Sequence, residues 1–369
     1  MVLESIQAVS LEIPFKLSFK HAAAARASTQ AIWVVAEGHD GARGFGEGCP
    51  REYVTSESLE SARAFVAEHS ADWLERIRDV PTLEDWERAH RKEIDANPAA
   101  WTAVELALLD LLGKAEGKTV ESLLGLTPMH GRYRYTAVLG DASPREFDAH
   151  LARYRQAGFR DFKIKLAGDA VRDRAKARSL EAAGIAPAAV RADANNLWGA
   201  PGAAVDYLKA LQFPFLALEE PLRAADYEGM QQMALALDAK IVLDESMARP
   251  EQLACLGGAP DRWLINLRVS KMGGVLRSLE FLDEARRCGL GVIVGAHVGE
   301  TSLLTRAALT VASAAGELLV AQEGAFGTHL LERDVVELPI MFGPGGILDV
   351  DARAIGKAPG WGLSVRETA

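Results

Sequence analysis

The chain has 369 residues, of which 49% are hydrophobic and 25% charged, a composition typical of a soluble protein with room for a large α/β barrel and a smaller unit. Its formal net charge of −10 argues against nucleic acid as a partner, because phosphate binding needs a basic face. We expect neither a membrane span nor a signal peptide, since no uncharged apolar run approaches about 18 residues. Three cysteines, far apart in sequence, indicate reduced thiols and a cytoplasmic location.

Residues 1 to 45 are rich in β-branched residues and turn signals and predict strands, and residues 57–125 predict helices. The clearest helix covers residues 99–117, where apolar side chains recur at helical spacing. Gly113 and Gly117 are expected to mark its end. Strands followed by helices indicate an α+β unit at residues 1–130.

From about residue 133, short apolar runs precede amphipathic helices eight times. The expected strands are residues 133–139, 161–167, 189–195, 215–221, 240–246, 262–268, 290–298 and 317–324. Buried strands that alternate with helices predict a parallel (β/α)8 TIM barrel over residues 131–334. Residues 335–369 return to strand and turn patterns and are expected to pack back on the N-terminal unit.

Polar side chains stand at the carboxyl end of seven consecutive strands, where barrel enzymes carry their active sites. They are Lys163 and Lys165, Asp193 and Asn195, Glu219, Asp244, Arg268, His297 and Glu323. The steps from Lys165 onward are 24 to 29 residues, close to one βα unit of roughly 30 residues.

Three of these residues, Asp193, Glu219 and Asp244, are carboxylates on adjacent strands. Carboxylates that converge repel one another unless a cation lies between them. Oxygen ligands in an open site favour Mg²⁺, with Mn²⁺ as a substitute. The alternative is that the acids form salt bridges with lysines of the barrel mouth.

Lys163 and Lys165 are separated by one residue on one strand, so their side chains point to the same face. Two close ammonium groups lower each other's pKa, which can leave a lysine as a neutral base near pH 7. The alternative is a pair of solvated lysines.

Together these motifs resemble the enolase superfamily, and more closely its muconate-lactonizing-enzyme and mandelate-racemase branches, which include dipeptide epimerases and N-acylamino acid racemases. The resemblance rests on the ordered set KIK at 163–165, DAN at 193–195, EEP at 219–221, DES at 244–246 and KMGG at 271–274, and covers nearly the whole chain. It implies a capping domain at residues 1–130 and Mg²⁺ on the three carboxylates. It also implies that Lys165 removes the α-proton of a small carboxylate substrate to give a metal-stabilised enediolate, with Lys163 tuning that base. Barrels of this kind are commonly homo-oligomers.

Arg268 departs from both branches. One branch has a second lysine here, and the other has an aspartate that pairs with a strand-7 histidine. Arginine is a poor base but a good bidentate clamp for a carboxylate. With His297 as second base, racemisation or epimerisation remains possible, whereas Lys165 alone suits cycloisomerisation or β-elimination of water. His297 as a packed barrel residue is the alternative.

Four residues are predicted to bind substrate: Asn195, Glu323, Tyr53 and Arg26. The last two lie in segments 15–26 and 47–55, which are expected to close over the barrel, with an ordinary surface role as the alternative. The segment around Glu323 lacks the paired aspartates of dipeptide epimerases, which disfavours a dipeptide substrate. An isomerase is the expected function, and a dehydratase, a glycosidase and a binding barrel without catalysis are the alternatives.

Overall fold

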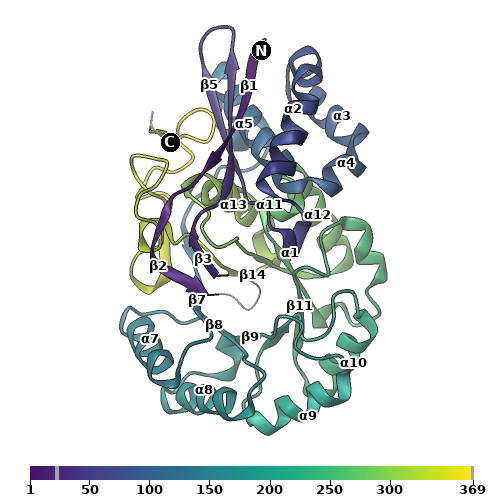
Figure 1. Ribbon diagram of the computed structural model, residues 1–369, viewed down its shortest axis with the longest axis vertical. Coiled ribbons are helices and arrows are strands. Elements are labelled where there is room, and N and C mark those ends of the chain that lie inside the picture. Colours follow the sequence, from purple (N-terminus) through teal and green to yellow (C-terminus); the bar gives the residue numbers. More distant parts are fainter. Residues whose placement is uncertain (21–24, 367–369) are drawn as a thin grey trace.

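The computed structural model describes residues 1–20 and 25–366, and for residues 17–20, 25 and 26 it describes the backbone alone. Figure 1 shows two units, a layer of strands and helices above a ring of strands surrounded by helices. The upper unit contains β1 (Leu3–Leu11), β2 (Pro14–Lys20), β3 (Ala25–Ser28), β4 (Ala31–Gly38) and β5 (Arg43–Gly48), then α1 (Glu52–Thr55), α2 (Leu59–Arg76), α3 (Val80–Ala89), α4 (Arg91–Ala96), α5 (Pro98–Glu116) and α6 (Val120–Leu123).

The antiparallel sheet of this unit, in the order β1-β4-β5, packs against α5. Glycines on β5 let the helix approach the strand closely, because a Cβ atom on Gly46 would lie 1.8 Å from the carbonyl oxygen of Ala103. Every residue of α5 from Pro98 to Gly113 is buried. The long apolar stretch that predicted this helix is therefore the centre of the upper unit.

The expected helix end at Gly113 is wrong. The helix continues to Glu116, and Gly117, with a φ of 66°, caps it. A Cβ atom on Gly113 would lie 2.8 Å from the Cα atom of Gly360. The glycine makes room for the C-terminal segment and does not end the helix.

All eight predicted barrel strands are confirmed. They are β7 (Ala137–Leu139), β8 (Phe162–Lys165), β9 (Val190–Asp193), β10 (Ala217–Glu219), β11 (Lys240–Leu243), β12 (Trp263–Leu267), β13 (Gly291–Val294) and β14 (Leu319–Gln322). They form one parallel sheet in chain order. The Thr136 backbone N–H donates to the Gln322 carbonyl across 2.8 Å and bridges the seam between the first and last strands.

The connections depart from a regular (β/α)8 pattern in two places. The barrel helices are α7 (Pro144–Gln156), α8 (Ala170–Ala182), α9 (Pro201–Leu211), α10 (Tyr227–Leu237), α11 (Val269–Met272), α12 (Val275–Cys288) and α13 (Ser302–Ala315). Between β11 and β12 the chain forms only the 3₁₀ turns η2 (Pro250–Cys255) and η3 (Pro260–Arg262). After β14 it forms the short turn η5 (Gly327–His329) and enters the C-terminal segment.

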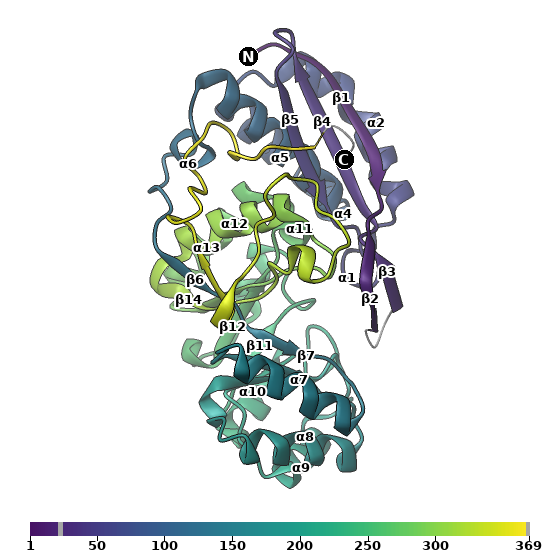
Figure 2. The ribbon, with the colours of Figure 1, turned by 90° about the vertical axis from the view of Figure 1, so that its left-hand side faces the viewer.

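The described part of the C-terminal segment forms one strand, β15 (Ile347–Asp349), which pairs with β6 (Arg132–Arg134). Among the described residues, positions 335–340 and 359–365 form no further strand and meet at an isolated bridge between Val336 and Val365. Trp361 instead bonds α5, where its Nε1–H donates to the Leu106 carbonyl at 2.9 Å. Figure 2 shows this segment running beside α5. The division at residues 130 and 334 stays a prediction.

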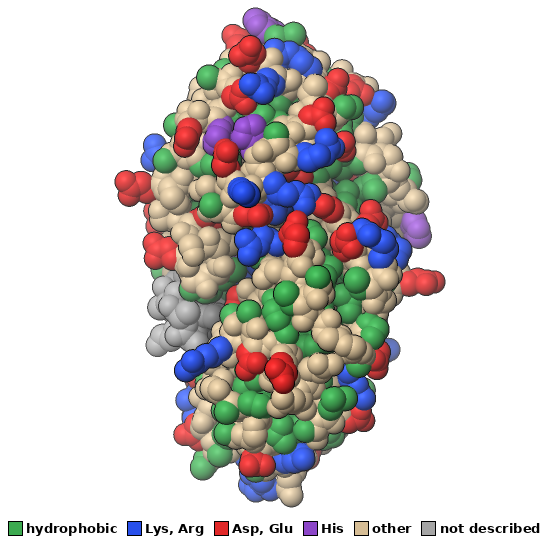
Figure 3. Space-filling model, turned by 90° about the vertical axis from the view of Figure 1, so that its right-hand side faces the viewer, with side chains coloured by type: hydrophobic (Ala, Val, Ile, Leu, Met, Phe, Trp, Pro, Cys, Tyr) green, Lys and Arg blue, Asp and Glu red, His purple; other side chains and the backbone are tan. Residues whose placement is uncertain are grey.

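On the face shown in Figure 3, acidic and basic side chains are intermixed, and neither charge dominates. Among the described residues, no helix is both long and apolar enough to cross a membrane.

Candidate active site

The predicted strand-end residues meet at the barrel mouth. Lys165, Asp193 and Glu219 are directly in register across β8, β9 and β10. Asp244 follows β11 and Arg268 follows β12, each just beyond its strand. The carboxylates and the lysine are buried, at 2% to 6% exposure. A small apolar layer lies on the preceding parts of the strands: Ala217, Val242, Leu264, Ile293 and Ala321.

Cationic side chains lie against each of the three acids. The Nζ atom of Lys163 is 2.6 Å from Glu219 and 3.6 Å from Asp193. The Nζ atom of Lys165 is 3.3 Å from Asp193. Arg268 donates a hydrogen bond to Asp244. The salt bridges that the sequence offered as an alternative to a metal are therefore present.

These contacts change the expectation for the lysine pair. Burial disfavours the charged form of Lys163, but Glu219, Glu323 and Asp193 outweigh it and raise the pKa of this lysine. The expected lowering by its neighbour is wrong for Lys163, because three carboxylates surround it.

The donor set still fits Mg²⁺. Among the described residues, no three acidic, histidine or cysteine side chains are spaced as a closed metal-ligand group. However, the buried Oε2 atom of Glu219 accepts no hydrogen bond among the described residues, and its contact at 2.6 Å is the ion pair with Lys163. Burial raises the pKa of Glu219 to about 8, with Lys163 opposing the rise and Asp193 and Asp244 adding to it. A carboxylate whose charged form is disfavoured by burial, set among other oxygen donors, is the environment that a hard divalent cation stabilises.

A second group of residues holds Asp244 in place, and the sequence reasoning missed their role. The Glu220 carboxylate accepts hydrogen bonds from the Asp244 N–H at 2.7 Å and from the N–H and hydroxyl of Ser246 at 2.9 and 2.7 Å. Glu220 has a φ of 40°, a strained value for this residue type. The second glutamate of EEP and the serine of DES were the available signal.

Lys271 anchors the same loop. Its Nζ atom lies 3.0 Å from Oδ1 of Asp244 and donates to the carbonyls of Asp244, Met247 and Asn266 at 2.6, 3.0 and 2.8 Å. Lysine in the KMGG motif therefore ties the ends of β11 and β12 together.

His297 lies just beyond β13 and is 3% exposed. Among the described residues, neither ring nitrogen has a hydrogen-bond partner. The nearest acid oxygen, on Glu300, is 3.7 Å from Nδ1 and accepts a hydrogen bond from the His297 backbone N–H. Burial, with the charges of Arg268 and Arg51, lowers the pKa of His297 well below 6.5. The imidazole is therefore neutral.

Arg51, which the sequence reasoning also missed, connects the upper unit to the barrel. Its guanidinium donates to the carbonyls of Thr29 at 3.2 Å, Gln30 at 3.0 Å and Val298 at 3.1 Å. Val298 directly follows His297. This buried arginine therefore joins the turn between β3 and β4 to the strand-7 loop.

The four predicted substrate-binding residues are placed differently from one another. Asn195 accepts a hydrogen bond from Lys165 at 2.8 Å. Glu323 lies 3.0 Å from Lys163 and is also engaged by Arg191, at 3.3 Å. Tyr53 lies on α1 and is 41% exposed. Arg26 belongs to β3, and its side chain lies outside the described part of the chain.

Two buried glutamates of the upper unit cap barrel helices beside the site. Glu105 of α5 accepts the backbone N–H groups of Val275 and Leu276 at 2.7 and 2.8 Å. Gly274, at the start of α12, has a φ of 109°, and a Cβ atom there would lie 2.5 Å from the Glu105 carboxyl group. Glu47 likewise accepts the Thr301 N–H at the start of α13 at 3.0 Å. The helices that follow β12 and β13 therefore begin against the upper unit.

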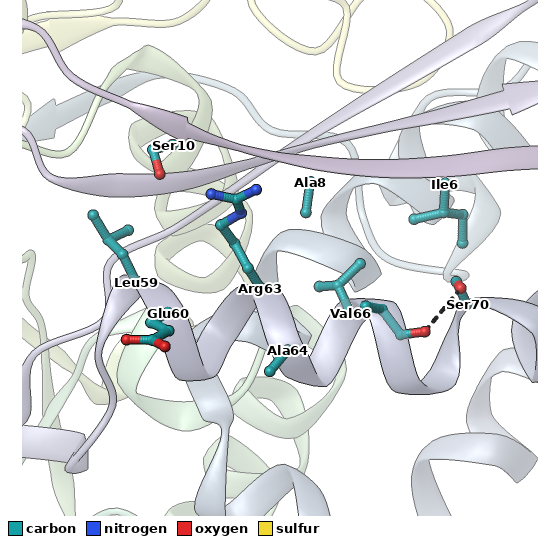
Figure 4. A pocket seen from close by; sticks show the side chains of 10 residues that line it. Ile6, Ala8, Ser10, Leu59, Glu60, Arg63, Ala64, Val66 and Ser70 are labelled. Atoms are coloured by element: carbon teal, nitrogen blue, oxygen red, sulfur yellow. Dashed lines mark hydrogen bonds between the residues drawn. The ribbon is translucent and has the colours of Figure 1, made fainter.

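A separate surface hollow of about 630 Å³ lies between β1 and α2. Figure 4 shows Arg63 and Val66 extending from α2 toward the strand. Its lining contains one acid and one base, Glu60 and Arg63, among mainly small and apolar residues. The converging acids and cations lie at the barrel mouth, so we place the active site there.

Comparison with known proteins decides the family. Residues 4–125 match the mandelate racemase / muconate lactonizing enzyme N-terminal domain, and residues 146–369 match the enolase C-terminal domain-like family. The chain belongs to the mandelate racemase/muconate lactonizing enzyme group of the enolase superfamily.

Its relatives in this family include the L-Lys-D/L-Arg epimerase of Methylococcus capsulatus, 29% identical over 88% of both chains. The N-succinyl-L-Arg/Lys racemase of Bacillus cereus is 22% identical over 100% of this chain and 96% of the racemase. Among solved structures, muconate lactonizing enzyme from Pseudomonas fluorescens has the same fold, with a TM-score of 0.86 at 24% identity over 100% of this chain and 97% of that one. A dipeptide epimerase from Enterococcus faecalis, solved with Mg and L-Leu-L-Tyr, has a TM-score of 0.81 at 24% identity over 99% and 100%.

Proposed function

We propose that this protein is a Mg²⁺-dependent racemase or epimerase that moves the α-proton of a carboxylate substrate. The observation that carries the proposal is the shared layer of Lys165, Asp193 and Glu219 at the strand ends. It places an amine beside a group of carboxylates suited to a divalent cation. The names of the relatives, which are epimerases and racemases, support the same reaction class.

In this proposal Lys165 takes the α-proton on one face of the substrate. Its Nζ atom is held by Asn195 at 2.8 Å, and the lysine is only 6% exposed. A fixed amine beside the substrate can accept the α-proton and deliver a proton, or in D₂O a deuteron, to the same face.

Asp193, Glu219 and Asp244 would hold the Mg²⁺ ion. The chemistry that such a cation supplies is stabilisation of the negative charge that develops on the substrate carboxylate as the proton leaves. Glu220 and Lys271 keep Asp244 directed at the site through the contacts described above.

His297 is proposed as the acid–base group on the opposite face. It is neutral, buried and without a hydrogen-bond partner among the described residues, so a ring nitrogen can accept a proton. Its lowered pKa suits a base better than an acid that must protonate a leaving hydroxyl. This favours the isomerase over the dehydratase.

The proposed substrate carries no free ammonium group beside strand β14. Glu323, the acid at that position, is already paired with Lys163 and Arg191. An acylated amino group would avoid competing for this carboxylate, whereas an ammonium group would need it.

Proton exchange tests the proposal. N-acylamino acids, dipeptides and hydroxy acids are incubated with enzyme and Mg²⁺ in D₂O, and deuterium at the α-carbon is followed by NMR. We expect incorporation for an N-acylamino acid, and a loss of at least 100-fold in Lys165→Ala with the fold retained. Undiminished exchange in Lys165→Ala would contradict the assignment of the base. Loss of water from a hydroxy acid without exchange would favour the dehydratase.

A further inference from the structure

Arg268 lies inside the group of acids proposed to hold the metal. Its Nη2 atom donates to Oδ2 of Asp244 and is 3.9 Å from Oε1 of Glu219. Lys271 is 3.0 Å from the other oxygen of Asp244. Both oxygens of this carboxylate therefore already have a cationic partner.

The two cations on Asp244 differ in what holds them. Lys271 donates to three backbone carbonyls and is fixed. The Arg268 guanidinium makes one hydrogen bond among the described residues, to Asp244, and its buried Nε atom has no partner. The arginine side chain, whose other ion-pair contact is the one with Glu219 at 3.9 Å, can therefore leave Asp244 without breaking another hydrogen bond, whereas the lysine cannot.

Arg268 also differs in chemistry from a lysine at this position. A lysine can lose its charge by losing a proton, but an arginine stays charged at every ordinary pH. A divalent cation at Asp244 would therefore stand next to a permanent positive charge, and both would need the same oxygen.

We propose that Arg268 is an internal competitor of the divalent cation for Asp244. Cation binding requires the guanidinium to leave Oδ2, so the metal affinity of the empty enzyme is set by the strength of the arginine–aspartate pair. Arg268 is in this sense a positioning residue for the metal. The inference rests on the proposed metal site.

The test is direct binding of Mn²⁺, measured from the electron paramagnetic resonance signal of free hexaaqua Mn²⁺. Four proteins are compared without substrate: the wild type, Arg268→Met, Arg268→Gln and Arg262→Met. Arg262 is the matched control, because it precedes β12 as Arg268 follows it and pairs with Asp238 at 2.7 Å. Circular dichroism verifies folding, and the two Arg268 variants give independent readings if one of them does not fold.

We expect the Kd for Mn²⁺ to fall at least tenfold in both Arg268 variants and to change less than twofold in Arg262→Met. Adding Asp193→Asn to Arg268→Met should abolish the gain, which assigns it to this site. Equal Kd values in the wild type and the Arg268 variants would overturn the competition and leave the proposed metal site intact. No Asp193-dependent binding in any of these proteins would overturn both.

Discussion

The hydrogen bonds between Glu105 and the start of α12 lead to a quantitative prediction. The change is Glu105→Ala, at a residue with 0% exposure. It removes the acceptor for two backbone N–H groups, that of Val275, which is buried, and that of Leu276, which is partly buried. Leaving a buried donor without a partner costs about 1–3 kcal/mol each. Burial raises the pKa of Glu105 well above its usual range, so part of that cost is recovered when the carboxyl group is removed. We expect a net loss of about 2–4 kcal/mol.

Thermal unfolding followed by circular dichroism measures this effect. An unfolding entropy of about 2.1 cal/mol/K per residue over 369 residues converts 1 kcal/mol to roughly 1.3 °C. Glu105→Ala should therefore lower the Tm by about 3–5 °C. Glu105→Gln, which keeps one acceptor, should lie between this variant and the wild type.

The control is Glu116→Ala at the C-terminal end of α5, where Glu116 forms an exposed ion pair with Lys118. Exposed pairs contribute about 0–1 kcal/mol, so its Tm should change by roughly 1 °C or less. If the Tm of Glu105→Ala equals that of this control, the capping of α12 by the upper unit does not stabilise the protein.

Three further changes test the site and the fold. His297→Asn should stop proton transfer on one substrate face while exchange at the Lys165 face continues, measured separately with the two enantiomers of the substrate; equal loss from both faces would argue against a second base. Asp244→Asn should abolish Mg²⁺ binding in calorimetry with little change in the circular dichroism spectrum, and retained binding would remove Asp244 from the ligand set. Glu57, whose pKa burial raises to about 7 against the backbone N–H groups of Ala99 and Ala100, binds its proton more tightly in the folded state. Its contribution to stability therefore falls as pH rises from 4.5 to 7, by at most about 3 kcal/mol, and the Tm of the wild type should fall relative to that of Glu57→Gln over that window. A difference that does not vary with pH would show that Glu57 stays ionised.

The barrel could be predicted from the sequence because its signal is local. Each strand is a short apolar run, and a residue such as Asp193 or Glu219 directly follows the run, so its position in the ring comes from chain order alone. The path of the C-terminal segment could not be predicted, for the opposite reason. Trp361 is an apolar residue whose role is to pack and hydrogen-bond against α5. The local sequence around it does not encode this contact.

The contacts within the site could not be predicted for the same reason. Arg51 binds the backbone carbonyls of Thr29 and Val298, which are distant from it in sequence. Every residue type carries the same backbone carbonyl, so the sequence gives no sign of which ones bind the arginine. For Arg191, the sequence did contain a weak indication that its side chain lies near the site. It lies two positions before Asp193 on β9 and therefore points to the same face of the strand.

The carbonyl contacts of Arg51 also bear on how this protein can diversify. A guanidinium that binds main-chain oxygens places no demand on the side chains at positions 29, 30 and 298. Substitutions at the exposed position 30 can leave the join between the two units intact, whereas Thr29 is buried and its hydroxyl is hydrogen-bonded to the backbone of Leu11 and Ile13. An insertion would disrupt the hydrogen bonds of Arg51, since one added residue between Thr29 and Gln30 would shift the carbonyl acceptors. We therefore expect constancy in length in the turn between β3 and β4, with drift in composition at the exposed position 30.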